Sequence, residues 1–185
     1  MTNNVLPDTR YKIVTRQQVA AELHRRQQAG ERGVFTNGCF DLLHLGHVRY
    51  LQEARNLGDF LVLALNSDES VQRLKGAGRP LVPEMERAEI LAALTCIDYV
   101  TIFPEATASA LLKLLQPAIY VKGGDYAGAQ GNMPDSSRLP EAAIVQAYGG
   151  AIRLIPYVPQ RSTTELIAAI KRLPLSVPSN GSGEL

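Results

Sequence analysis

The stretch Gly33-Val-Phe-Thr-Asn-Gly-Cys-Phe-Asp-Leu-Leu-His-Leu-Gly-His47 carries the strongest signal in this chain. It begins as an apolar run typical of a buried strand, and a glycine turn, a carboxylate and two histidines three residues apart follow. The histidines stand where the next helix begins, and a helix N-terminus attracts phosphate through its free N–H groups and partial positive charge. The stretch therefore predicts a phosphate site at a strand–turn–helix junction, with imidazoles available for chemistry on a nucleotide.

Strand-like and helix-like segments alternate on both sides of this stretch. The apolar spacing predicts helices over 16–29, 48–57, 84–94, 106–115 and 139–148, and from Ser162 or Thr163 to Arg172. In the helix over 84–94 the expected core residues are Ile90, Leu91 and Leu94. Strands are predicted over 33–36, 60–65, 98–103, 118–121 and 151–155. Single helices between strands indicate right-handed βαβ units. We expect an α/β, Rossmann-like, doubly wound sheet of five parallel strands in one domain over 1–173, followed by a disordered tail over 174–185.

Composition limits the possible partners. The 185 residues carry 19 Lys and Arg against 18 Asp and Glu, so no bulk charge attracts the chain to nucleic acid or to an anionic membrane. No apolar run is long enough to cross a bilayer, and the polar first residues do not resemble a secretory signal. The two cysteines, Cys39 and Cys96, make no disulfide framework, which favours a cytoplasmic location.

Residues suited to ligand binding gather at one edge of the predicted sheet. In sheets of this kind ligands lie beyond the carboxyl ends of the strands. The segments expected there are 37–47, 66–79, 104–107, 122–126 and 156–164, and four of the five combine basic residues or glycine with hydroxyls or carboxylates. We therefore expect the site along this edge.

The histidine pair allows three interpretations. His44 and His47 share one helix face, and Gly46 between them lets a ligand approach the backbone. They could bind phosphate, join Cys39 or Asp41 in a metal site, or serve only as capping or core residues. The preceding strand and glycine turn favour phosphate. Zinc is disfavoured because no second Cys/His cluster stands at a familiar spacing.

The motif resembles a known family signature. Gly38-Cys-Phe-Asp-Leu-Leu-His-Leu-Gly-His47 is similar to the signature of the HxGH nucleotidyltransferase superfamily, in its cytidylyltransferase-like branch. Further similarity to the ADP-heptose synthase adenylyltransferases comes from Arg73–Pro80, Arg87–Leu94, Tyr120–Tyr126 and Ser162–Thr164. The resemblance runs from about Thr15 to Leu173. A sugar kinase is often fused to this domain, and because 185 residues leave no room for one we expect the stand-alone form.

The resemblance implies transfer of AMP from ATP to D-glycero-β-D-manno-heptose 1-phosphate, giving ADP-heptose and pyrophosphate for the inner core of lipopolysaccharide. It also implies Mg²⁺ with the ATP, and a homo-oligomer. The alternative is a cytidylyltransferase acting on glycerol phosphate or a similar small alcohol phosphate, since the residues do not separate adenine from cytosine. A non-catalytic nucleotide-binding module is disfavoured because binding alone would not need both histidines, Lys75 and Lys122. A nicotinamide dehydrogenase is disfavoured because no Gly-x-Gly-x-x-Gly follows the first strand.

Residue roles follow from the same resemblance. The implied catalytic residues are His44, His47, Lys75 and Arg87. The implied ATP-binding residues are Thr36, Asn37, Gly38, Cys39, Phe40, His44, Gly46, His47, Lys122, Gly123, Asp125, Ser162, Thr163 and Thr164. The residues expected to contact or orient the acceptor are Asp41, Arg79 and Asp125. No protein side chain is predicted to hold a metal.

Simpler interpretations stand beside several of these roles. Asp41 could cap a helix, and Lys75 could be a solvated lysine in a glycine-rich loop. Ser162, Thr163 and Thr164 could serve only to cap the last helix. Arg87 opens a helix, where its charge opposes the helix dipole, so a phosphate or carboxylate partner is expected. Two departures from the family concern the sugar: Arg161 stands in place of a glycine, and 127–137 is long enough for either a lid or a surface insertion.

Overall fold

Five parallel strands form one sheet in the order β3-β2-β1-β4-β5. The computed structural model describes residues 8–123, 139–156 and 162–173. The strands are β1 (Gly33–Gly38), β2 (Phe60–Asn66), β3 (Tyr99–Phe103), β4 (Ile119–Gly123) and β5 (Ala151–Ile155). The chain moves outward from β1 in one direction and then returns to its other side, so the order reverses between β1 and β4. The predicted Rossmann-like sheet of five parallel strands is confirmed.

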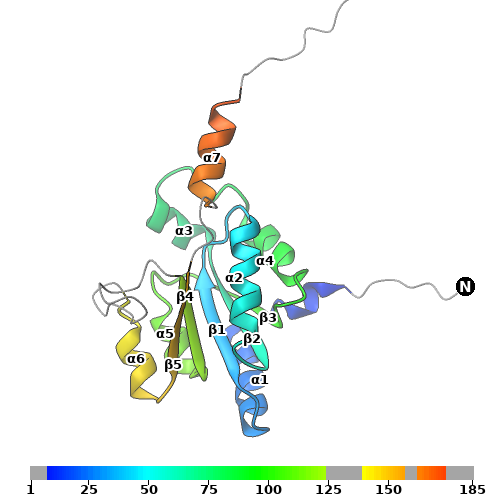
Figure 1. The fold of residues 1–185 in the computed structure, drawn as a ribbon, viewed down its shortest axis with the longest axis vertical. Coiled ribbons are helices and arrows are strands. Elements are labelled where there is room, and N and C mark those ends of the chain that lie inside the picture. The colour runs from blue at the N-terminus through cyan, green and yellow to red at the C-terminus, as the bar shows by residue number, and fades with distance from the viewer. Residues whose placement is uncertain (1–7, 124–138, 157–161, 174–185) are drawn as a thin grey trace, which may run out of the picture.

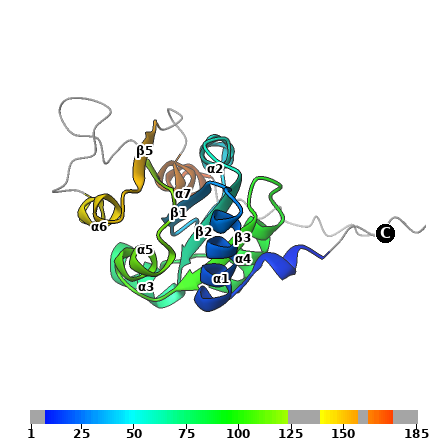
Figure 2. The same ribbon diagram turned by 90° about the horizontal axis from the view of Figure 1, so that it is seen from below.

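Helices cover both faces of the sheet. They are the 3-10 helix η1 (Thr9–Lys12) and the α-helices α1 (Arg16–Gln28), α2 (Leu45–Arg55), α3 (Asp68–Lys75), α4 (Glu84–Ala92), α5 (Ser109–Leu115), α6 (Ala142–Ala147) and α7 (Thr163–Lys171). Helices α1, α5 and α6 pack on one face, and α2 and α4 on the other (Figures 1 and 2). Helix α7 projects beyond the carboxyl edge of the strands (Figure 1). None of the helices described is both long and apolar enough to span a bilayer.

The central strand β2 shows why continuous apolar runs predicted this sheet. Every residue of β2 is buried. Side chains alternate along a strand, so Phe60 and Val62 enter the core beneath α1 and α5, while Leu61 and Leu63 enter the core beneath α2 and α4. A strand covered on both faces needs apolar residues at every position, which is the pattern of 60–65.

Helix α3 lies where a flexible loop was predicted. Ser67 is its N-cap and accepts a hydrogen bond from the backbone N–H of Ser70 at 3.2 Å. Asp68 and Glu69 occupy the first turn, where negative charge is favourable, and the helix ends at Gly76 in a left-handed conformation. These capping signals are present in the sequence, and they place Lys75 on the last turn of a helix.

A buried arginine occupies the core face of α4, where Ile90 was expected. The buried residues of α4 are Arg87, Ala88, Leu91 and Ala92. Ile90 lies off this face and is 48% exposed, so the prediction that it is a core residue is wrong. The predictions for Asp125, for 127–137, for Arg161 and for the tail over 174–185 fall outside the described residues.

Candidate functional site

Two helix N-termini meet the histidine motif at the carboxyl edge of the sheet. Strand β1 ends at Gly38, and the following loop leads to His44, which is the N-cap of α2. Helix α7 begins beside that loop, because the hydroxyl of Thr163 donates to the carbonyl of Leu42 at 3.4 Å (Figure 1). The N-termini of both helices therefore lie next to the same loop, an arrangement that favours a bound polyanion.

The two histidine rings stack. The ring centroids of His44 and His47 are 3.9 Å apart with planes 20° from parallel, and the Phe40 ring lies 5.1 Å from His47. Burial, and then the neighbouring His44, lower the pKa of His47 to about 4, while the Leu42 carbonyl acts in the opposite direction. His47 is therefore neutral at pH 7 in the free protein. A polyanion beside the ring would favour its charged form.

The turn between β1 and α2 holds a residue in an unusual backbone conformation. Phe40 has a φ of 44°, in the left-handed region that bulky residues rarely adopt. Gly38 leaves room for this turn, because a Cβ at that position would lie 2.9 Å from Cε2 of Phe40. Such a conformation persists only where neighbouring groups hold it.

Arg87 is one of those groups. Its side chain has no exposed surface, and it donates to the carbonyls of Cys39 at 2.6 Å, Val82 at 2.8 Å and Asn66 at 3.0 Å. It also pairs with the carboxylate of Asp68 at 2.6 Å. The expected carboxylate partner is therefore confirmed. The predicted contact with substrate is not available to a guanidinium buried on all sides, because its bonds join the ends of β1 and β2, the start of α3 and the segment before α4 to one another.

Asp41 connects the histidine motif to the segment before α4. Its side chain is 1% exposed and accepts from Arg79 Nε at 2.5 Å, from Leu81 N–H at 2.7 Å and from Val82 N–H at 3.1 Å. The N-cap of α2 is His44, so the interpretation of Asp41 as that cap is wrong. What Asp41 orients in this structure is Arg79 and the backbone of 81–82.

Asn37 and Lys122 lie together on the other face of the same edge. Asn37 Oδ1 accepts from Tyr120 Oη at 2.9 Å and from Lys122 Nζ at 3.1 Å. These side chains follow Phe35 and Tyr120 by two residues in their strands, so they lie on the side of the sheet covered by α1 and α5. The predicted ATP-binding residues thus come from both faces, and Gly123 ends β4 beside them.

Thr36 contributes to packing in this structure. It is fully buried, and its hydroxyl lies 2.7 Å from Tyr50 Oη and donates to the carbonyl of Val121 at 3.1 Å. These bonds join β1 to α2 and β4. Because the Thr36 hydroxyl is buried and bonded in this way, it is not exposed for the predicted contact with ATP. Tyr50 was not singled out from the sequence because it lies in no motif, and Tyr120 entered only as the first residue of the segment Tyr120–Tyr126, with no role of its own.

Three cations lie close enough to the turn between β1 and α2 to act on Cys39. Burial raises the pKa of the Cys39 thiol, and the charges of Lys75, Arg87 and Arg79 act against that rise. Lys75 is exposed at the end of α3 and is the cation of the three with the greatest reach toward solvent. Their combined field favours an anion at Cys39, where the backbone rather than the thiol makes the structural contacts.

Ser162 caps α7, as one interpretation predicted. Its Oγ accepts from the backbone N–H of Glu165 at 3.1 Å and donates to Glu165 Oε2 at 3.0 Å. Thr163 faces Leu42, and Thr164 is exposed on the first turn. The capping role of Ser162 is therefore confirmed.

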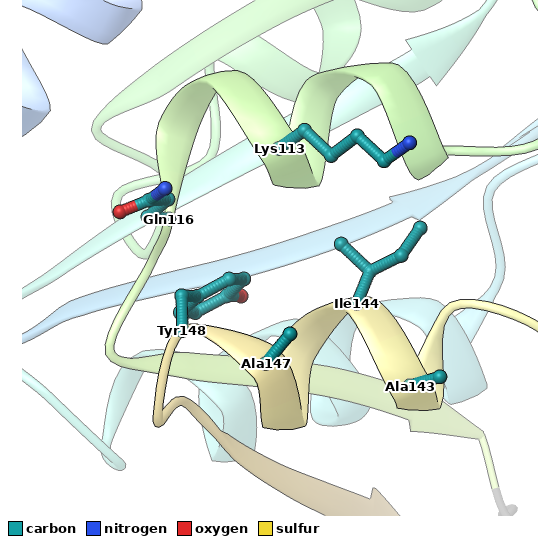
Figure 3. A pocket seen from close by; sticks show the side chains of 6 residues that line it. All are labelled: Lys113, Gln116, Ala143, Ile144, Ala147 and Tyr148. Atoms are coloured by element: carbon teal, nitrogen blue, oxygen red, sulfur yellow. The ribbon is translucent and has the colours of Figure 1, made fainter.

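Two cavities of similar size differ in their relation to this edge. One, of about 380 Å³, lies between α5 and α6 and is lined by Lys113, Gln116, Ala143, Ile144, Ala147 and Tyr148 (Figure 3). Gln116 and Tyr148 are the C-caps of these helices, so one end of this cavity lies at the opposite edge of the sheet. The other, of about 390 Å³, lies between α3 and the segment 79–83 and includes Arg79, the partner of Asp41. Only the second adjoins the histidine motif.

The chain is similar in sequence to known proteins. The chain is 50% identical over 165 residues to the "Bifunctional protein HldE" of Geotalea uraniireducens, covering 89% of this chain and 32% of that protein. It is 52% identical over 163 residues to the protein of the same name from Syntrophotalea carbinolica, covering 86% of this chain and 31% of that protein. The chain thus spans about a third of the length of these curated relatives.

A solved structure is similar as well. The lipopolysaccharide core biosynthesis protein from Thermoplasma volcanium GSS1 shares 25% identity with a TM-score of 0.55, covering 70% of this chain and 98% of that one. A model of the family described as cytidylyltransferase-like matches residues 35–167, from β1 through the first turns of α7. Because that match includes most of the sheet and the whole histidine motif, this chain belongs to the cytidylyltransferase-like family.

Proposed function

We propose that this protein is a nucleotidyltransferase that transfers AMP from ATP to D-glycero-β-D-manno-heptose 1-phosphate, giving ADP-heptose and pyrophosphate for the inner core of lipopolysaccharide. The observation that carries the reaction class is the stacked His44–His47 pair at the start of α2, beside a turn surrounded by cations. Support for the sugar comes from similarity to the HldE proteins and to a lipopolysaccharide core biosynthesis protein.

The reaction needs positioning and charge stabilisation. A phosphate oxygen of the sugar 1-phosphate attacks the α-phosphorus of ATP, the bond from that phosphorus to the oxygen bridging to the β-phosphate breaks, and its electron pair leaves with pyrophosphate. No covalent enzyme intermediate is required. Negative charge grows on the α-phosphate oxygens and on the leaving group, so preorganised donors and cations at those positions lower the barrier.

His44 and His47 supply donors at the α- and β-phosphates. In the free protein His47 is neutral because burial lowers its pKa to about 4. Bound phosphates raise that pKa again by placing negative charge beside the ring. The imidazole thereby gains positive charge when ATP arrives, and it is in place to stabilise the transition state.

The remaining residues divide into those that contact ATP and those that position others. Lys75 and the first turn of α7, with Ser162, Thr163 and Thr164, bind the outer phosphates, and Asn37, Gly46, Lys122 and Gly123 approach the nucleotide from β1, α2 and β4. We assign Arg87 and Thr36 to positioning, because both side chains are buried and bonded to protein groups. The homo-oligomer stays a prediction.

Mg²⁺ enters with ATP as part of the substrate. Asp41, the carboxylate of the histidine motif, already accepts three hydrogen bonds within the protein. We therefore expect the phosphate oxygens of ATP to hold the ion, which neutralises charge on the leaving pyrophosphate.

The alternative is a cytidylyltransferase acting on glycerol phosphate. It is retained because the family to which the chain belongs is described as cytidylyltransferase-like. A pyrophosphate-release assay over ATP and CTP, each with heptose 1-phosphate and glycerol phosphate, distinguishes the two. We expect turnover with ATP and the heptose phosphate. Replacing His47 with alanine should lower kcat by about a hundredfold or more, as removal of a transition-state donor does. The exposed Arg49, replaced with alanine, is the control and should keep wild-type kcat.

A further inference from the structure

The cavity between α3 and the segment 79–83 has a cationic end and an acidic wall. Its volume is about 390 Å³, within the range of small-molecule sites. Arg79 lies at the end that joins the histidine motif, and Asp68, Glu69 and Gln72 of α3 line the opposite wall. We propose that this cavity is the subsite for the sugar 1-phosphate, with the phosphate at Arg79 and the sugar hydroxyls toward α3; this inference rests on the function proposed above.

Arg79 has hydrogen-bonding capacity left for a phosphate. Its Nε donates to Asp41, which fixes the plane of the guanidinium. Neither Nη group makes a hydrogen bond to any residue that the structure describes, and the side chain is 20% exposed. A guanidinium with both Nη groups open offers a paired contact to a phosphate. Its charge also acts on Cys39, so a phosphate bound there lies beside the turn assigned to ATP.

The α3 wall suits hydroxyl groups. The Asp68 side chain is 44% exposed and uses one carboxylate oxygen to hold Arg87, while Glu69 and Gln72 are exposed on the same helix. Carboxylate and amide oxygens accept hydrogen bonds from sugar hydroxyls. A further carboxylate, that of Glu84, accepts from the backbone N–H of Asp68 at 2.7 Å.

The same features disfavour a nucleotide in this cavity. The two carboxylates that line the α3 wall, Asp68 and Glu69, would repel a triphosphate. The described residues that line the cavity include no aromatic ring on which a base could stack. A ligand with many hydroxyls and one phosphate matches both ends, and it would present its phosphate oxygen to an ATP held at His44 and His47.

Two single variants on α3 test the subsite, Gln72→Leu and Glu69→Gln. Both side chains are exposed, so neither change should reduce stability, and thermal melts verify this. We expect each to raise the KM for heptose 1-phosphate about tenfold, the loss of about one hydrogen bond, and to leave the KM for ATP within about twofold. The matched controls are Gln52→Leu on α2 and Glu86→Gln on α4, which lie outside the cavity and should keep both KM values.

The outcomes separate the subsite from the proposed function. If the wild type makes ADP-heptose and both α3 variants keep its KM for the sugar phosphate, the subsite is overturned and the function stands. A parallel rise of both KM values also overturns the subsite, since the cavity would then serve ATP. If the wild type does not use ATP, calorimetric binding of heptose 1-phosphate decides: binding weakened only in the α3 variants supports the subsite, and equal binding in all four variants overturns it.

Discussion

The guanidinium of Arg87 donates to the carbonyl of Cys39 at 2.6 Å, and this bond sets the direction of the peptide that follows. In a trans peptide the carbonyl and the next N–H point in opposite directions, so the N–H of Phe40 points away from the buried guanidinium. Phe40 is held in the left-handed region at the same time. A buried residue of α4 thereby determines the shape of the turn that precedes the histidines.

Replacing Arg87 should affect stability and catalysis separately. Arg87→Met leaves three carbonyls and Asp68 without their donor, and we expect the free energy of unfolding to fall by about 3 kcal/mol, measured by urea denaturation. Arg87→Lys keeps the charge but cannot reach all four acceptors. It should raise the KM for ATP by about tenfold or more because the turn loses its fixed direction. Wild-type kinetics in a folded Arg87→Lys protein would contradict the positioning role.

The Asp41–Arg79 pair should behave as one unit. In Asp41→Asn one amide oxygen can still accept from Leu81 and Val82, but the amide nitrogen faces Arg79 as a second donor. We expect kcat/KM for the sugar phosphate to fall by about tenfold or more. Arg79→Gln should do the same, and the double variant should lose no more than the worse single one. Additive losses would show that the two residues act independently.

The low pKa of His47 predicts a dependence of stability on pH. The folded pKa of about 4 lies below the ordinary value of 6.5, so the unfolded chain binds a proton more readily between those values. Stability from this group is therefore complete above pH 6.5 and is lost as the pH falls toward 4, by up to about 3 kcal/mol. Urea denaturation across this window, compared with His47→Gln, measures the effect. An identical pH profile in the two proteins would mean that His47 titrates normally.

Two buried threonines give a matched test of packing. The hydroxyl of Thr101 is buried without a hydrogen bond to any described residue, whereas that of Thr36 bonds Tyr50 and the Val121 carbonyl. Thr101→Val removes a desolvated hydroxyl and should leave the free energy of unfolding equal or higher by about 1 kcal/mol. Thr36→Val should lower it by about 1–2 kcal/mol. The reverse order in thermal or urea melts would contradict this hydrogen-bond pattern.

Local signals predicted the sheet because its central strands β1, β2 and β4 are covered on both faces. The apolar run over 60–65 and the glycine turn after 33–36 required no long-range information. Helix α3 was missed although Ser67, Asp68 and Gly76 mark its ends, because the nearby glycines suggested a loop. The surroundings of Arg87 could not be predicted locally, since only the fold brings residues 39, 66, 68 and 82 to one side chain.

Identification of the product tests the central proposal most directly. Equal amounts of ATP and CTP are mixed with the wild-type protein, Mg²⁺, heptose 1-phosphate and glycerol phosphate, and the nucleotide-linked products are identified by mass spectrometry alongside pyrophosphate release. We expect ADP-heptose as the main product, and about one hundredth of that amount or less in the same mixture with His47→Ala over the same time. CDP-glycerol as the main product, with no ADP-heptose, would contradict the proposed function.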